Sequence, residues 1–341
     1  YAIFVGIHLA GVGEALKVMM IISGLAVVAI LVTAIALVGD FQTANLFNIA
    51  ATDASGASEF LPLGWYGIWA ALPFGMWLFL AVEGVPLAAE EARNPAKDMP
   101  KAIIGAMIFL LFTGLLVVVL LAGAAGAELI GSSGVPLVDA LKATGNPSLA
   151  MAINALGLTG LIASFFSVIY GYSRLVFALS RAGYLPKVLS VTSGTKAPKW
   201  ALVAPAVFGF VVSLTGAGDL ILGMAVVGAT ISYALMSASH IMLRFKRPDL
   251  DRPYKTPGGV FTSSVALILS LVAMTGVYAF DPRAFNYTIV LFVIGSAYYF
   301  LYSRNRLVAK TADEELALIL DAESSLEGEV VPEVTPQPVR A

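Results

Sequence analysis

The sequence predicts an all-α polytopic membrane protein, and three observations lead to this fold class. First, 59% of the 341 residues are hydrophobic and only 12% are charged, and the mean hydropathy is +0.88; a soluble domain has about 25% charged residues. Second, apolar runs long enough to cross a bilayer recur along the chain. Third, the basic residues between these runs gather on one side. Because helices satisfy their backbone polar groups internally in lipid, we expect one integrated helical bundle.

Nine apolar runs approach or reach the length of about 20 residues that a spanning helix needs. The first is short, and no initiator methionine, basic segment or small-residue cleavage site precedes it, so we expect a chain that starts inside a membrane span. Together the runs predict a transmembrane domain over residues 1–306. The nine expected spans are 1–12, 16–39, 61–89, 102–126, 149–178, 200–216, 219–243, 259–280 and 285–303.

The connectors between the expected spans alternate in charge. All of the 20 lysines and arginines fall on one side except Lys142 and Arg283. By the positive-inside rule, the basic side is cytoplasmic. We therefore expect a multi-pass protein of the cell membrane, with membrane lipid around it and its C-terminus in the cytoplasm. The acidic, proline-containing tail at 307–341 is expected to be largely disordered.

Several function classes find no support in the sequence. The chain has no cysteine, hence no thiol chemistry. It has no cluster of metal-ligand residues, no glycine-rich phosphate loop with its lysine, and no plausible Ser-His-acid set. We expect no enzyme, no cofactor and no nucleic-acid partner. The oligomeric state does not follow from the sequence.

The span at 61–89 contains a carboxylate in an unusual position. Glu83 follows nineteen uncharged residues, and a charge at such depth costs a few kcal/mol, so it is expected to face protein or water and to be functional. The alternative is an interfacial glutamate near the cytoplasmic end. Gly84 and Pro86 favour the functional interpretation, since Gly84 tolerates unusual dihedrals and Pro86 has no N–H for the helix. We expect these two residues to break the helix.

A broken membrane helix survives where it lines a cavity or binds a ligand. The carbonyls freed by the break, those of Leu80, Ala81 and Val82, would combine with the Glu83 carboxylate into a site for a cation. Discontinuous helices of this kind mark the binding sites of secondary transporters. Trp77 and Phe79 lie just before the break and could offer ring faces to an ammonium group, although bundle packing is the simpler explanation for each of them alone.

Two other spans carry candidate polar residues. Ser164 and Ser167 fall on one helical face with Gly171 and could line the substrate path or help to coordinate sodium. Serines in membrane helices also bond their own backbone or a neighbouring helix, and this alternative stays open. On the span at 219–243, Ser232 and Tyr233 could close the site, with the same alternative.

Three motifs resemble the amino acid, polyamine and organocation (APC) transporter superfamily. EGVPLAAEEARNPAKDMPKA at 83–102 is similar to the sixth helix of that superfamily and its following loop. GYSRLVFALSRAGYLPKVL at 171–189 is similar to the eighth helix and its connector, and LRFKRPDLDRPYKTPGG at 243–259 to the connector after the tenth. Within the superfamily, ALPFGMWLFLAVEGVPLAAEE and GYSRLVFALSRAGYLP resemble ethanolamine permeases most.

The resemblance implies a fold of two inverted five-helix repeats with two additional C-terminal helices. The nine spans would then be about helices four to twelve of twelve, with the first three absent from this chain. A lysine that some members carry in the fifth helix has no counterpart in MIISGLAVVAIL at 20–31. A lysine-based proton mechanism therefore does not transfer, and either a proton or sodium remains a candidate coupling ion.

The expected function is import of a small organic amine, ethanolamine in particular, by a secondary transporter using alternating access. Residues Trp77, Phe79, Ala81, Val82, Glu83, Gly84, Ser232 and Tyr233 are the expected substrate site. Two alternatives remain. One is a permease of the same superfamily for neutral or basic amino acids, and the other is a channel or a transporter-like sensor.

Overall fold

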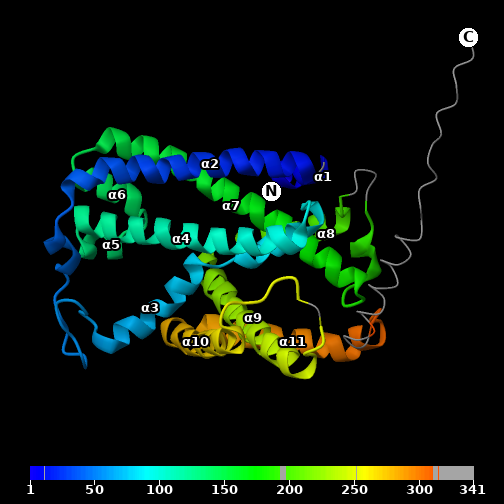
Figure 1. Ribbon diagram of the computed structural model, residues 1–341. Coiled ribbons are helices and arrows are strands. Elements are labelled where there is room, and N and C mark those ends of the chain that lie inside the picture. Colours follow the sequence, from blue (N-terminus) through cyan, green and yellow to red (C-terminus); the bar gives the residue numbers. More distant parts are fainter. Residues whose placement is uncertain (11, 193–196, 251, 310–313, 315–341) are drawn as a thin grey trace, which may run out of the picture.

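The computed structural model describes residues 1–10, 12–192, 197–250, 252–309 and 314 (Figure 1). Within these ranges every regular element is a helix. The α-helices are α1 (Ala2–Ala10), α2 (Val12–Leu37), α3 (Gly64–Leu78), α4 (Pro95–Ala125), α5 (Ala127–Ser132), α6 (Pro136–Ala143), α7 (Pro147–Arg181), α8 (Lys199–Ser213), α9 (Gly218–Lys246), α10 (Gly259–Phe280) and α11 (Pro282–Leu301). The 3₁₀ helices are η1 (Val38–Asp40), η2 (Thr43–Phe47), η3 (Val82–Glu91), η4 (Lys187–Ser190) and η5 (Ser303–Asn305).

Local sequence signals set the starts of the long helices. Asn94 caps α4 by accepting a hydrogen bond from the backbone N–H of Lys97, and a proline follows at the first helical position. This cap starts the helix before the expected span at 102–126. Asp281 caps α11 in the same way, accepting from the backbone N–H groups of Arg283 and Ala284.

The described part of the chain contains seven helical stretches that are long and apolar enough to cross a membrane, namely Lys17–Asp40, Gly64–Ala89, Pro95–Ala125, Pro147–Arg181, Gly218–Lys246, Gly259–Ala279 and Pro282–Asn305. This confirms the all-α polytopic fold class. The other two expected spans, at 1–12 and 200–216, form the shorter helices α1 and α8. With 15 residues, α8 extends about 22 Å, less than the hydrocarbon thickness of about 30 Å. The expected disordered tail lies almost entirely outside the described residues.

The helices pack in two groups (Figure 1). The first helix group comprises α1, α2 and α4–α8, with α7 contacting α2, α6 and α8. The second helix group comprises α3, α9, α10 and α11, with α10 contacting α3, α9 and α11. The 3₁₀ helix η3, which continues the chain beyond α3, contacts α4 and α7 of the first group. The span at 61–89 therefore passes from one group to the other.

The largest buried cluster lies in the first helix group. Four helices contribute to it, and small residues let their backbones approach closely. Helix α6 is packed into the group, because its Ala140 and Leu141 are fully buried in this cluster. The buried members are Ala29, Leu37, Leu120, Leu121, Ala124, Ala140, Leu141, Ala150 and Ile153.

Helix α3 is fixed to α10 at one place. The Trp69 indole N–H donates to the hydroxyl of Thr275 over 3.0 Å. Pro73 stands inside α3 and has no N–H to give to the carbonyl of Trp69 four residues earlier. Gly276 of α10 faces that carbonyl, and a Cβ at Gly276 would lie 2.9 Å from its oxygen. The absence of a side chain at Gly276 therefore lets α10 approach the proline-weakened turn of α3.

Candidate functional site at the interrupted helix

The span at 61–89 is interrupted at Phe79–Ala81. Helix α3 ends at Leu78, and Ala81 has left-handed dihedrals, φ 72° and ψ 8°. In the described part of the chain Ala81 is the one non-glycine residue with a positive φ. That conformation costs about 1–2 kcal/mol for an L-residue. The surrounding structure must therefore hold Ala81 in place, as is common at functional sites.

The interruption lies a few residues before Gly84 and Pro86, the two residues expected to break the helix. The left-handed residue Ala81 turns the chain, and we call this turn the reversal. Gly84 and Pro86 lie after it, inside η3. The α-helix has to stop earlier because Pro86 cannot donate to the carbonyl of Val82, and in the 3₁₀ pattern it leaves the carbonyl of Glu83 without its donor. The Ala81 carbonyl, which we expected to be freed, accepts the backbone N–H of Gly84 over 3.0 Å.

The two polar residues expected from different spans meet at the interruption. The hydroxyl of Tyr233, in the middle of α9, donates to Oε2 of Glu83 over 2.7 Å. Tyr233 therefore links α9 to the start of η3, although it is 150 residues away from Glu83 in sequence.

Glu83 retains capacity to bind a ligand. Its side chain is exposed, and within the described residues its second carboxylate oxygen has no hydrogen-bond partner. A carboxylate that is oriented through one oxygen and open at the other can receive an ammonium group or another cation by a charge-assisted hydrogen bond. Val82 and Gly84 on either side of Glu83 are half-buried, so the backbone that carries the carboxylate is partly packed.

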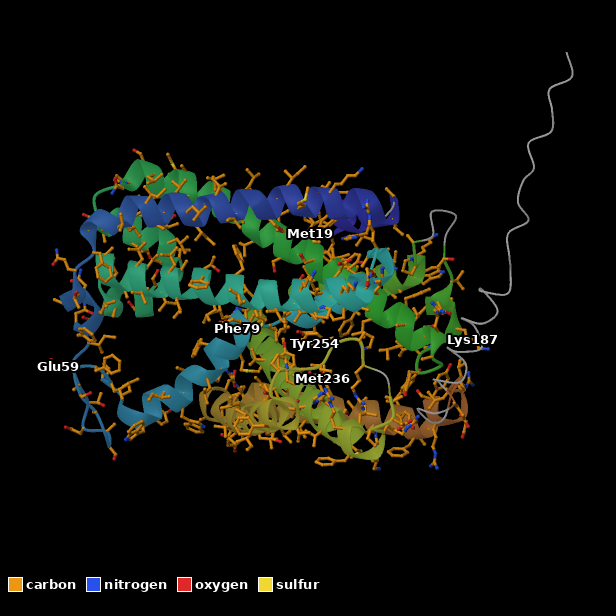
Figure 2. The ribbon with its side chains drawn as sticks, viewed as in Figure 1. Met19, Glu59, Phe79, Lys187, Met236 and Tyr254 are labelled. Carbon is orange, nitrogen blue, oxygen red and sulfur yellow. The ribbon has the colours of Figure 1, made fainter. Side chains whose placement is uncertain are left out.

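The other residues expected in the substrate site are close in sequence to Glu83 or to Tyr233, but within the described residues their side chains make no hydrogen bond to either. Phe79 is half-buried at the reversal, where Figure 2 shows it close to the end of α3. Trp77, in the last turn of α3, is 44% exposed. Ser232 is exposed and precedes Tyr233 on α9; consecutive helical residues point in different directions. The structure therefore joins Glu83 and Tyr233 by contact and places Ala81 at the reversal. Trp77, Phe79 and Ser232 belong to the expected site only by position.

The serine face of α7 is divided between two neighbours. Ser167 donates to the carbonyl of Ala163 over 2.8 Å and lies 3.1 Å from the sulfur of Met19 on α2 (Figure 2). This is the backbone and neighbouring-helix bonding that stood as the alternative for Ser167. Ser164 is exposed. Gly171 faces η3 instead, since a Cβ there would lie 3.8 Å from Leu87.

Two residues of the site's support were missed from the sequence. Trp69 and Gly276 fix α3 against α10, so that the helix ends where Glu83 can meet α9. Pro73, inside an apolar span, was a signal of a weakened turn. Nothing in a single sequence pairs that turn with Gly276, about 200 residues later.

Comparison with known proteins identifies a family. The chain matches the family model described as "Amino acid permease" over residues 1–295. It is 30% identical over 249 residues to the branched-chain amino acid permease BcaP of Bacillus subtilis (strain 168), covering 72% of this chain and 52% of that protein. It is 27% identical over 253 residues to the methylthioribose transporter of the same organism, covering 72% of this chain and 53% of that protein.

A human protein belongs to the same set of relatives. The cystine/glutamate transporter of Homo sapiens is 28% identical over 264 residues, which cover 76% of this chain and 50% of that protein. The chain thus spans about half the length of the curated relatives it matches.

Proposed function

Because this chain belongs to the amino acid permease family, within the APC superfamily, we propose that the protein is a secondary transporter that imports a small solute bearing an ammonium group. The observation that carries the proposal is the hydrogen bond from Tyr233 to Glu83 at the interrupted helix. It orients a carboxylate at the point where the chain passes between two helix groups, and leaves one oxygen for the substrate cation.

Alternating access follows from the same connection. Helix α3 packs with the second helix group and η3 packs on the first, so any relative movement of the groups changes the backbone around Ala81. Transporters of this kind expose a fixed site to each side of the membrane in turn by rocking one bundle against another. We propose that the Tyr233–Glu83 hydrogen bond breaks and forms again as the two helix groups move. From the positive-inside pattern of the connectors, we also propose that the C-terminus lies in the cytoplasm.

Two substrates are candidates for different reasons. Ethanolamine is supported by the motifs at 71–91 and 171–186 and by the open carboxylate, because protonated ethanolamine is a cation without a carboxylate. A neutral amino acid is supported by the relatives, one of which is named a branched-chain amino acid permease. An amino acid also needs a partner for its carboxylate, and the backbone N–H groups at the start of η3 are of the right kind.

The proposal is tested with the full-length protein in liposomes. Counterflow of labelled ethanolamine and of labelled leucine is measured with excess unlabelled substrate inside, under a proton gradient and then a sodium gradient. Saturable counterflow of one substrate would support transport and name the substrate, and the gradient that drives accumulation would name the coupling ion. A channel would give no counterflow, and that result would overturn the proposal.

Variants assign the role of the site. Removing a charged hydrogen-bond partner costs about 1.5–3 kcal/mol, so Glu83→Gln is expected to weaken substrate affinity roughly 10-fold to 100-fold. Tyr233→Phe should have a smaller effect, because it frees the carboxylate without removing its charge. Glu128→Gln, on the exposed surface of α5, is the matched control. Normal transport by Glu83→Gln would contradict the role assigned to Glu83, but it would not contradict the proposal that the protein is a transporter.

A further inference from the structure

Two chain segments meet where α7 and α11 end. The backbone N–H of Val308 donates to the carbonyl of Ala182 over 3.1 Å, and the hydroxyl of Ser303 donates to the carbonyl of Tyr184 over 2.7 Å. Gly183 lies between them with φ +90°, and its Cα faces the carbonyl of Arg306 so closely that a Cβ would collide with it. The segments therefore form one fixed structure, although they are about 120 residues apart.

A cavity of about 370 Å³ opens beside this contact. Its lining contains two basic side chains, Lys187 and Arg306, together with Tyr302, Gly183 and Leu185. Figure 2 shows Lys187 at the end of the molecule where the described part of α11 also ends. Within the described part of the chain, neither Lys187 nor Arg306 is paired with a carboxylate. Among the residues that the structure describes, the walls of the cavity therefore carry two positive charges with no carboxylate to neutralise them.

The arginine is held in a defined orientation. Its guanidinium lies 4.1 Å from the centroid of the Tyr302 ring, and Nη1 donates to the Tyr302 hydroxyl over 2.9 Å. An arginine fork has five N–H donors, so this one bond leaves others for a ligand. A planar guanidinium fixed by an aromatic ring, with a lysine ammonium beside it, is suited to the tetrahedral oxygens of a phosphate group.

The position of the cavity favours one source of phosphate. Helices α7 and α11 both belong to stretches that are long and apolar enough to cross a membrane, and the cavity lies at the ends of both. Tyr184 and Tyr299 stack beside it with ring centroids 6.2 Å apart. Tyrosines gather at the depth of lipid headgroups, and basic pockets between membrane helices bind anionic headgroups.

We propose that the cavity lined by Lys187, Tyr302 and Arg306 is a binding site for the phosphate of an anionic phospholipid. The phosphate would bridge the lysine and the arginine, and the acyl chains would lie along the exposed apolar surface of α11, where Leu301, Phe300 and Ile294 are exposed. Bound lipid would thereby join the ends of α7 and α11. The site is separate from Glu83 and does not depend on the substrate.

The test measures thermal stability of the full-length protein in detergent with added phosphatidylglycerol, phosphatidylcholine or inorganic phosphate. Phosphatidylglycerol is expected to raise the melting temperature in a saturable manner, and phosphatidylcholine is expected not to. Each basic residue near a membrane surface contributes about a factor of 5 in affinity. Lys187→Gln/Arg306→Gln should therefore raise the half-saturating concentration of phosphatidylglycerol roughly 30-fold. Arg304→Gln, which removes one charge two residues from Arg306 but outside the cavity lining, is the control and should raise the half-saturating concentration by no more than about 5-fold.

A charge-preserving variant guards against misfolding. Lys187→Arg/Arg306→Lys keeps both charges and should retain most of the response to phosphatidylglycerol, detected also as bound lipid by native mass spectrometry. Equal responses of the wild type and the Gln double variant would overturn the proposal. If inorganic phosphate reproduces the full effect and displaces no lipid, the site binds free phosphate, and the lipid proposal is wrong.

Discussion

The first helix group and the interrupted span differ in how firmly they are packed. In the first group, Leu37, Ala140 and Leu141 are completely buried where α2, α4, α6 and α7 meet. Along Gly64–Ala89, by contrast, 6% of the most apolar window is buried, against 22% along Pro147–Arg181. Regions with few buried contacts open at low free energy. We therefore expect the first group to supply most of the stability and the interrupted span to be the part that opens more readily.

Truncation of a buried leucine should produce the largest loss of stability. Leu141→Ala leaves a void in the cluster formed by four helices, and van der Waals packing is what holds helices together in lipid. We expect the free energy of unfolding to fall by about 2–4 kcal/mol. Thermal or detergent unfolding measures this change. Leu235→Ala, at a position 60% exposed on α9, is the control.

The two leucine variants decide whether the packing difference matters. An equal loss from Leu141→Ala and Leu235→Ala would show that burial in the first group does not determine stability. Substrate binding by the folded fraction of Leu141→Ala should be close to that of the wild type, because Leu141 is not part of the candidate site.

A side chain at Gly276 should disturb the interrupted span and spare the first group. In Gly276→Val, the new Cβ would lie 2.9 Å from the Trp69 carbonyl oxygen and 3.4 Å from Cδ of Pro73. Helix α3 must then move away from α10, at a cost of about 1–3 kcal/mol. Transport should fall with it, since α3 positions the reversal at Ala81.

A matched glycine provides the control for this variant. Gly295, on α11, has no atom within 4 Å of its constructed Cβ, so Gly295→Val should keep both stability and transport near the wild-type values. If Gly276→Val transports normally while it is destabilised, the anchoring of α3 to α10 serves stability alone.

Part of this architecture was predictable from the sequence, for identifiable reasons. Composition and long apolar runs predict membrane helices strongly. Of the nine predicted spans, seven form helical stretches of membrane-spanning length in the described part of the chain, and the other two form the shorter helices α1 and α8. Glu83 was expected at the site because a carboxylate in an apolar span is conspicuous, and Tyr233 was a candidate to close the site from another span. Their contact was not predictable, because it depends on how α9 crosses η3.

The strained residue at the helix break shows where local signals fail. Gly84 and Pro86 indicated a break near Leu80–Val82 but not the strain at Ala81, because alanine has no intrinsic preference for left-handed dihedrals. The strain is imposed from outside. Trp69 holds α3 to α10, and Leu87 packs η3 against Gly171, so the chain has to turn between them.

Because the backbone at Ala81 is left-handed, two substitutions there should change the free energy of unfolding moderately and in opposite directions. Ala81→Gly removes the clash of Cβ and is expected to raise the free energy of unfolding by up to about 1 kcal/mol, because relief of 1–2 kcal/mol is partly offset by the entropy of glycine. Ala81→Val should lower it, since a β-branched side chain fits this conformation worse.

Ala88→Gly, within η3, is the comparison for Ala81→Gly. Ala88 does not have a positive φ, so glycine there should only destabilise. If Ala81→Gly and Ala88→Gly have the same sign, the reversal at Ala81 is not strained, and its value to the protein would have to lie elsewhere.

The smallest effect is expected in the loop between α9 and α10. Arg247 donates to both carboxylate oxygens of Asp249, with distances of 3.0–3.3 Å, and these hydrogen bonds hold the pKa of Asp249 below its ordinary value of 3.8. A carboxylate whose pKa is lowered by folding stabilises the protein above its ordinary pKa, and the stabilisation is lost as the pH falls through the lowered value. Water and salt screen this fully exposed pair.

Asp249→Asn should therefore leave the melting temperature almost unchanged at neutral pH, with any difference disappearing below pH 3.8. A large loss at neutral pH would mean that this loop contributes to the packing of the second helix group, contrary to its exposure.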